Sequence, residues 1–86
     1  ITLLMPFYVY VIKSKLNGNL YKGQTDNLAK RLSEHNAGYN RSTKAFLPWE
    51  LVYFEEFETR EEALVREKYF KSGSGREFLK KVLSGS

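Results

Sequence analysis

An unbroken run of β-branched and aromatic residues, Phe7-Tyr-Val-Tyr-Val-Ile12, is the strongest constraint on how this chain can fold. Such residues favour extended backbone, and the absence of polar alternation predicts a strand that is buried on both faces. Asn17-Gly18 is a strong hairpin signal, because both residue types tolerate positive φ. Residues 20–24 should therefore return as an antiparallel strand. With an even-numbered loop, Tyr10 and Tyr21 project from the same face.

A helix is expected next. Thr25 or Asp26 can cap its start, the helix runs to about Ala37, and Gly38 is a natural terminator. The segment from Gly38 to Pro48 is then expected to be a basic, hydroxyl-rich loop.

The second half of the chain predicts one more strand and two more helices. Residues 49–57 resemble a strand, and Thr59 with Glu62 forms a capping box that opens a helix ending near residues 72–73. A short amphipathic helix with Phe78, Leu79, Val82 and Leu83 as its apolar residues closes the chain. The predicted fold class is α+β in the order ββαβαα, with a small three-stranded sheet, made of the hairpin plus a third strand, flanked by helices.

The length of 86 residues allows one hydrophobic core, which we expect to span residues 6–83. Residues 1–4 precede Met5, the expected native start, and we expect them to be foreign to the natural protein; residues 84–86 are expected to be a tail. No apolar run is long enough for a membrane span, so no membrane partner is expected. The lack of cysteine excludes a disulfide scaffold and a thiolate site, and it fits a cytoplasmic location.

Charge is divided along the chain into three blocks. Residues 1–48 carry seven basic and two acidic side chains (+5), residues 49–65 one and six (−5), and residues 66–86 six and two (+4). This order predicts one positive face, one acidic edge and an anionic partner.

Glu67 interrupts the apolar stripe of the helix over residues 60–72. It lies one turn from Ala63, Leu64 and Phe70, which are expected to face the core. A carboxylate in that position needs a partner, because uncompensated burial is costly. One interpretation is an ion pair with Arg31, Lys68 or Lys71; the other is a carboxylate that holds a divalent cation or a catalytic proton.

A second group of candidates lies on the hairpin and the first helix. Tyr10 and Tyr21 are either core rings or phenols that face a ligand, and Gly23 favours the ligand because a glycine inside a strand permits close approach. Arg31 and His35 are four residues apart, on one flank of the helix. Arg31 is suited to grip a phosphate, and His35 either assists it, relays a proton, or is a solvated side chain.

Five elements occur in order: Tyr8-Val-Tyr10, Tyr21-Lys-Gly23, Arg31, His35 and Glu67. Together they resemble the GIY-YIG nuclease domain, and within that superfamily the stand-alone, single-domain bacterial type often labelled excinuclease-subunit-C-like. The stretches His35-Asn-Ala-Gly38, Thr43, Pro48-Trp49 and Arg66-Glu67-Lys68 support the resemblance, which covers nearly the whole domain.

The resemblance implies a metal-dependent endonuclease that hydrolyses DNA phosphodiester bonds, with one Mg²⁺ or Mn²⁺ per site and a role in DNA repair or recombination. It implies that Tyr10 activates or orients the attacking water, that Tyr21 binds the scissile phosphate or a metal-bound water, and that Arg31 stabilises the developing charge. Glu67 is the implied metal ligand, and His35 assists.

The signatures are not complete. Tyr8, Val9 and Lys22 replace the glycine and isoleucines of the family pattern, and none of these positions supplies a catalytic side chain. The residues expected to contact nucleic acid are Lys22, Gly23, Lys30, Arg41, Thr43 and Lys44. DNA is the expected partner and RNA an alternative; a monomer is expected, with a transient dimer as the alternative.

Two other functions remain open at this point. A non-catalytic nucleic-acid-binding module would use Tyr10, Tyr21 and Trp49 as stacking platforms. A protein-interaction domain would dock a basic protein on the acidic block between Glu50 and Glu62.

Overall fold

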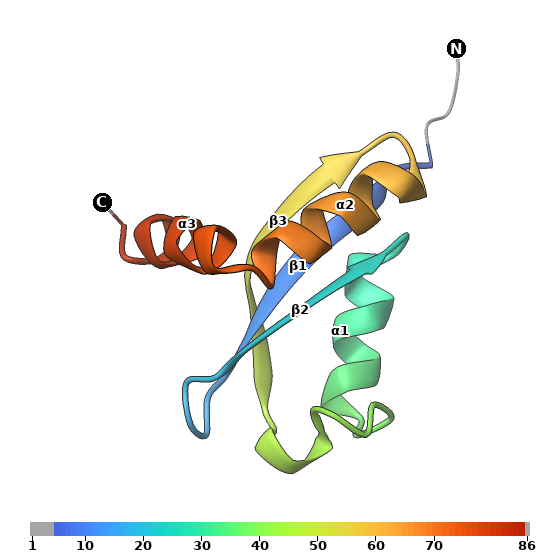
Figure 1. The fold of residues 1–86 in the computed structure, drawn as a ribbon. Helices are drawn as coiled ribbons and strands as arrows, with labels where there is room; N and C mark the ends of the chain where they lie inside the picture. The colour runs from blue at the N-terminus through green and yellow to red at the C-terminus, as the bar shows by residue number, and fades with distance from the viewer. Residues whose placement is uncertain (1–4, 86) are drawn as a thin grey trace.

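The computed structural model describes residues 5–85, and the expectations for residues 1–4 and Ser86 lie outside this range. Its elements follow the order β1 (Phe7–Ser14), β2 (Leu20–Thr25), α1 (Leu28–Asn36), a 3₁₀ turn (Lys44–Phe46), β3 (Trp49–Phe57), α2 (Arg60–Phe70) and α3 (Gly73–Leu83). The predicted α+β fold in the order ββαβαα is confirmed (Figure 1).

The sheet has the order β2-β1-β3 and is antiparallel throughout. β1 is central, which explains why residues 9–12 are buried whichever way their side chains point. Gly18 has a φ of 79°, as the hairpin prediction requires. β3 forms one edge and carries much of the acidic block, so the predicted acidic edge is present.

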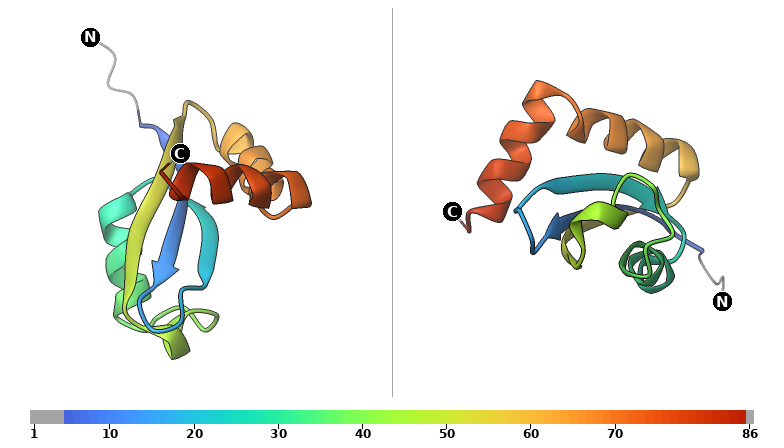
Figure 2. Two further views of the ribbon diagram at one scale, coloured as in Figure 1. Left: turned by 90° about the vertical axis from the view of Figure 1, so that its left-hand side faces the viewer. Right: turned by 90° about the horizontal axis from the view of Figure 1, so that it is seen from below.

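The helices lie on both faces of the sheet, α1 on one and α2 with α3 on the other (Figure 2). Val9 and Val11 point toward α2 and α3 and form a core with Ala63, Phe70 and Leu79. The alternate residues Tyr10 and Ile12 belong to a second core that includes Trp49, Leu28 and Leu32. A single strand thus supplies both cores through its two-residue side-chain period.

Some element boundaries differ from the predictions. Asn27, rather than Thr25 or Asp26, caps α1 and accepts a hydrogen bond from the amide of Lys30. The Thr25 hydroxyl instead accepts a hydrogen bond from the backbone N–H of Asn27, and this bond closes the turn before the helix. Gly38, with a φ of 81°, follows the helix as predicted.

The capping box of Thr59 and Glu62 is confirmed, but α2 ends at Phe70. Ser72 then caps α3 by accepting from the amide of Gly75, so α3 begins five residues before the predicted Phe78. Within residues 5–85, no helix is long and apolar enough to cross a bilayer.

Candidate active site

The hydroxyl group of Tyr10 is the centre of the candidate site. Its oxygen lies 2.9 Å from Nε2 of His35 and accepts a hydrogen bond from Nε of Arg31 at 3.3 Å. Tyr10 comes from the middle of β1, and the other two residues come from successive turns of α1. The sequence placed Arg31 and His35 on one helix flank, and in the structure this flank faces the phenol.

Tyr21 extends the same group of aromatic rings. Tyr10 pairs with Gly23 and Ile12 with Tyr21 across the hairpin, so Tyr10 and Tyr21 share a face as predicted. The ring centroid of Tyr21 lies 6.4 Å from that of Tyr10 and 5.0 Å from that of His35. Among the described residues, the Tyr21 hydroxyl has no hydrogen-bond partner. It is therefore the phenol of the pair that can bind a ligand without breaking an internal bond.

Gly23 lies directly beneath the ring of Tyr10. A Cβ atom at this position would be 2.5 Å from Oη and 2.6 Å from Cζ of Tyr10. The expected reason for this glycine, close approach of a ligand backbone, is wrong on this face of the strand, because the Tyr10 ring already fills the space.

We predict that Gly23→Ala displaces Tyr10 and lowers the free energy of unfolding by about 1–3 kcal/mol, the usual cost of overpacking. Urea unfolding of the single variant, of Tyr10→Ala and of the double variant measures this cost. If the clash with the ring is its origin, the alanine costs much less in the Tyr10→Ala background. Equal costs in both backgrounds would contradict the explanation.

Burial controls the protonation of the central pair. It raises the pKa of Tyr10 above the ordinary phenol value, although the hydrogen bond from Arg31 acts in the opposite direction. Burial lowers the pKa of His35, and the positive charge of Arg31 lowers it further. At neutral pH the structure therefore holds a protonated phenol against a neutral imidazole.

Glu67 approaches from α2, on the other side of the sheet. Its side chain is 19% exposed, and its Oε2 lies 2.7 Å from Nζ of Lys71, one of the three ion-pair partners considered from the sequence. Its negative charge contributes to the raised pKa of Tyr10, so the two groups are close enough to interact electrostatically.

The packing of α2 explains the position of Glu67 at the rim. Arg66 is anchored to Glu55 of β3, with its Nε 2.7 Å from Oε1 of Glu55, and Ala63 and Phe70 are buried. Ala63 and Phe70 thus define the buried line of α2, and the partly buried side chains of Arg66, 31% exposed, and Glu67, 19% exposed, flank it. The prediction that Leu64 faces the core is wrong: it lies outside this line and is 47% exposed.

A group of cations lies near Glu67. The pKa of Lys22 is lowered, first by burial and then by repulsion from Arg76 and Lys71. Lys22 was expected to contact nucleic acid, whereas sequence reasoning gave Arg76 no role and Lys71 only that of an ion-pair partner. No periodic pattern links β2 with the start of α3, so this cluster becomes visible only in the folded chain.

The expected nucleic-acid contacts fall into two classes. Lys30, Arg41 and Lys44 are exposed, and in the described part of the chain none of them pairs with an acidic side chain. Thr43 is fully buried, and its Oγ1 lies 2.8 Å from Nδ1 of His35. The expectation that Thr43 contacts nucleic acid is therefore wrong, because its hydroxyl is used inside the protein.

Two of the three aromatic platforms of the binding-module hypothesis are not available, and only Tyr21 is partly exposed. Tyr10 is 3% and Trp49 5% exposed, so neither ring can stack on a base. Trp49 instead donates from Nε1 to the backbone carbonyl of Thr43 at 2.9 Å. Asn36, which sequence reasoning missed, accepts from the backbone N–H of Trp49 at 2.7 Å and donates to its carbonyl at 2.9 Å.

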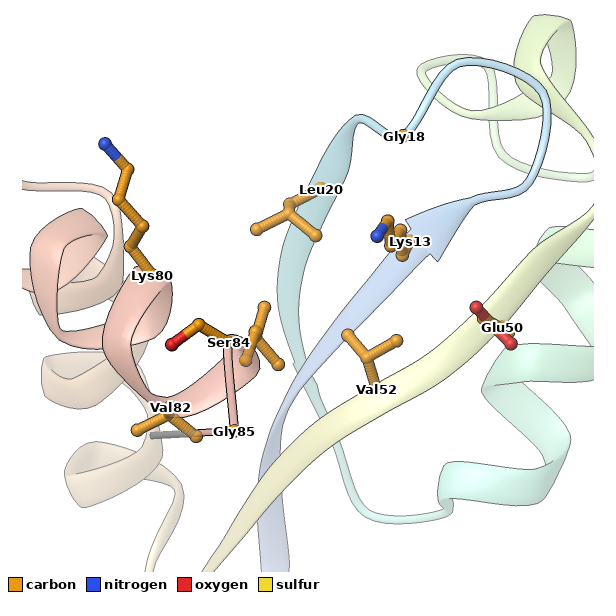
Figure 3. Close-up of a pocket in the computed structure, with 10 residues that line it drawn as sticks. Lys13, Gly18, Leu20, Glu50, Val52, Lys80, Val82, Ser84 and Gly85 are labelled. Atoms are coloured by element: carbon orange, nitrogen blue, oxygen red, sulfur yellow. The ribbon is translucent and has the colours of Figure 1, made fainter.

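A hollow of about 590 Å³ lies elsewhere, between α3 and the sheet. In Figure 3, Lys13, Leu20 and Val52 of the strands lie on one side of it, and Lys80 and Val82 of α3 lie on the other. It contains none of the predicted site residues. In the described chain no three carboxylate or imidazole groups gather around one point, so a metal ion here would depend on few protein ligands.

Comparison with known proteins identifies the arrangement. A family model described as the GIY-YIG catalytic domain matches residues 6–81. A UPF0213 protein from Staphylococcus saprophyticus is 40% identical over 79 residues, which is 91% of this chain and 95% of that protein. A UPF0213 protein from Clostridium perfringens is 42% identical over 80 residues, which is 92% of this chain and 85% of that protein.

A solved structure has the same fold. The solution structure of a UPF0213 protein from Bacillus halodurans aligns with a TM-score of 0.55 at 31% identity, covering 91% of this chain and 85% of that one. The resemblance read from the five motifs, and the single-domain type, are confirmed.

Proposed function

Because this chain belongs to the GIY-YIG catalytic domain family, we propose that it is a metal-dependent endonuclease that hydrolyses DNA phosphodiester bonds, in DNA repair or recombination. The observation that carries the proposal is the Tyr10 hydroxyl, held between a neutral imidazole and a guanidinium.

The raised pKa of Tyr10 decides how this phenol can act. A pre-formed phenolate is rare at neutral pH, so Tyr10 can accept a proton from water only while its own proton leaves. His35 is the acceptor within reach, and its lowered pKa keeps it neutral. Tyr10 thus orients the attacking water and takes its proton, while the phenol proton moves to His35.

Arg31 and Tyr21 are suited to bind the phosphate. Arg31 uses Nε for Tyr10 and Nη1 for Glu34, at 3.0 Å, which leaves Nη2 without a partner in the described chain. A guanidinium in this position stabilises negative charge on the non-bridging oxygens. Tyr21 interacts electrostatically with Arg31, and its free hydroxyl can donate to the same phosphate.

Glu67 would hold the Mg²⁺ or Mn²⁺. Mg²⁺ binds proteins through one or two carboxylates and completes its shell with water and substrate phosphate, which fits a single half-buried carboxylate. When bound, the cation would polarise the phosphate. Lys71, the present partner of Glu67, is 55% exposed and has room to move toward solvent or a DNA phosphate.

The DNA backbone would lie along the basic residues around the site. Lys22, Lys30, Arg41 and Lys44, joined by Lys71 and Arg76, provide positive charge without any group committed to reading bases. Such contacts position DNA independently of sequence. We therefore expect selection by structure, such as a nick, flap or branch, and cleavage by the monomer.

The test is a panel of end-labelled DNA and RNA duplexes, nicks, flaps and branches, incubated with Mn²⁺ or Mg²⁺. We expect DNA cleavage with either metal, none with excess EDTA, and recovery when metal is restored. Salt-sensitive binding that EDTA does not affect, without cleavage of any structure, would support the binding module and contradict the nuclease. Cleavage of RNA alone would contradict the proposal that DNA is the substrate.

A further inference from the structure

Both ring nitrogens of His35 are engaged inside the protein. The residue is fully buried, with Nε2 2.9 Å from the Tyr10 hydroxyl and Nδ1 2.8 Å from Oγ1 of Thr43. A neutral imidazole has one N–H group and one lone pair, so one nitrogen must donate and the other must accept. Which tautomer is present decides whether His35 can take a proton from Tyr10.

The contacts of Thr43 decide between the tautomers. Among the described residues its hydroxyl has one other hydrogen-bond partner, the backbone carbonyl of Asn40 at 3.5 Å, which can only accept. If the hydroxyl proton points to this carbonyl, Oγ1 presents a lone pair to His35, and Nδ1 carries the hydrogen. Nε2 is then a free acceptor facing Tyr10.

The opposite tautomer leaves a proton without a partner. With hydrogen on Nε2, the Tyr10 oxygen would accept from both His35 and Arg31, and the described residues offer the phenol proton no other acceptor. A buried donor without an acceptor costs about 1–3 kcal/mol. Only the form with hydrogen on Nδ1 gives every donor a partner in the series of hydrogen bonds that links Arg31, through Tyr10, His35 and Thr43, to Asn40.

Thr43 is held firmly in place to select this form. Its amide donates to the carbonyl of Asn40 at 3.2 Å, and its own carbonyl accepts from Nε1 of Trp49 at 2.9 Å. Asn36 fixes the backbone of Trp49 through two hydrogen bonds. The loop after α1 is thereby attached to β3, and the hydroxyl of Thr43 keeps its orientation toward His35.

We propose that Thr43 is a positioning residue that keeps the hydrogen of His35 on Nδ1, so that Nε2 accepts the proton of the Tyr10 hydroxyl. The effect on rate rests on the proposed function, whereas the tautomer itself does not. In the step, the water's O–H bond breaks and its proton joins the Tyr10 oxygen, while the phenol O–H bond breaks and that proton forms a bond with Nε2. The water oxygen bonds to phosphorus, the ester P–O bond breaks, and the leaving oxygen takes a proton from solvent. His35 ends as an imidazolium that still donates from Nδ1 to Thr43.

The protein contains a single histidine, so its imidazole ¹⁵N and ¹H NMR signals are unambiguous. In the wild type and in Thr43→Ser we expect a protonated Nδ1 and an unprotonated Nε2. In Thr43→Val, which keeps the side-chain shape, we expect a mixture or the reverse. Ser42→Ala removes a neighbouring exposed hydroxyl and is the matched control.

Kinetics then tests the consequence. With a cleavable DNA from the panel, we expect Thr43→Val to lower kcat about tenfold to a hundredfold at unchanged KM, Thr43→Ser to restore it, and Ser42→Ala to match the wild type. The acidic limb of the kcat profile should follow protonation of His35, below about pH 6.5, in the wild type. The groups that face His35 and shape this limb are Tyr10, Tyr21, Arg31 and Glu34.

The outcomes separate the two proposals. A wild-type spectrum with hydrogen on Nε2 overturns the inference without any variant, and it leaves the nuclease proposal standing. A tautomer change in Thr43→Val without loss of kcat overturns the positioning role. The expected spectra in a protein that cuts no nucleic acid would instead confirm the tautomer assignment and contradict only the nuclease function.

Discussion

Replacing Glu67 by glutamine is expected to reduce DNA cleavage about a thousandfold, which corresponds to about 4 kcal/mol of transition-state stabilisation. Glutamine keeps the size of the side chain but removes the charge with which a divalent cation would be bound. The fold should survive, because the residue lies beside the buried line of α2 and its ion pair with Lys71 is a partly exposed one. Single-turnover cleavage in saturating Mn²⁺ measures the loss.

The matched control is Glu77→Gln on α3, which also removes an ion pair, the 3.9 Å contact with Lys80, from an exposed helix surface. It should leave cleavage unchanged. Titration of each variant with Mn²⁺, followed by changes in tyrosine fluorescence or NMR, shows whether the metal-dependent response is lost only in Glu67→Gln. Undiminished cleavage by this variant, free of contaminating nuclease, would end the one-metal proposal.

Gly75→Ala is expected to produce the largest loss of stability, about 3 kcal/mol. A Cβ atom at this buried position would lie 2.6 Å from the carbonyl carbon of Tyr69 and 2.7 Å from Cα of Phe70, and it would overlap the Tyr69 oxygen. These are backbone atoms of α2, which cannot rotate away as a side chain can. The first turn of α3 would therefore have to separate from the end of α2.

Gly73→Ala provides the comparison within the same helical turn. No atom lies within 4 Å of a Cβ placed there, so the substitution should be neutral or stabilise by up to about 1 kcal/mol. Urea unfolding of the two variants measures the difference. Equal stability of both proteins would show that the contact between α2 and α3 is looser than the structure indicates.

The sequence predicted the site best where a regular period applies. The two-residue period of β1 and the hairpin loop placed Tyr10 and Tyr21 on one face, and the helical period placed Arg31 and His35 together. Thr43 lies in an irregular loop, where no period relates residues to space. Its contact with His35 depends on how the loop folds back on α1, and this the local sequence does not reveal.

Glycines explain the largest error in the fold prediction. Gly73 and Gly75 are unfavourable inside helices, so α3 was expected to begin only after them. Gly75 is present because two helices meet too closely there for any side chain, which is a tertiary requirement that helix propensity does not contain. The prediction that Leu64 faces the core was wrong for a similar reason, because an apolar stripe on a helix does not show which of its two sides a neighbouring strand will cover.

The central position of β1 makes the chain far more sensitive to changes in its length than to changes in its composition. Val9 and Val11 can vary in one core, and Ile12 in the other, without disturbing the opposite side of the sheet. Inserting or deleting one codon between Val11 and the hairpin loop would instead shift residue 10 by one position against β2, turning the phenol toward α2 and a valine toward His35. The face of the candidate site and the face of the opposite core would then be exchanged at once. Point substitutions in this strand are therefore tolerated far more readily than a shift of its register.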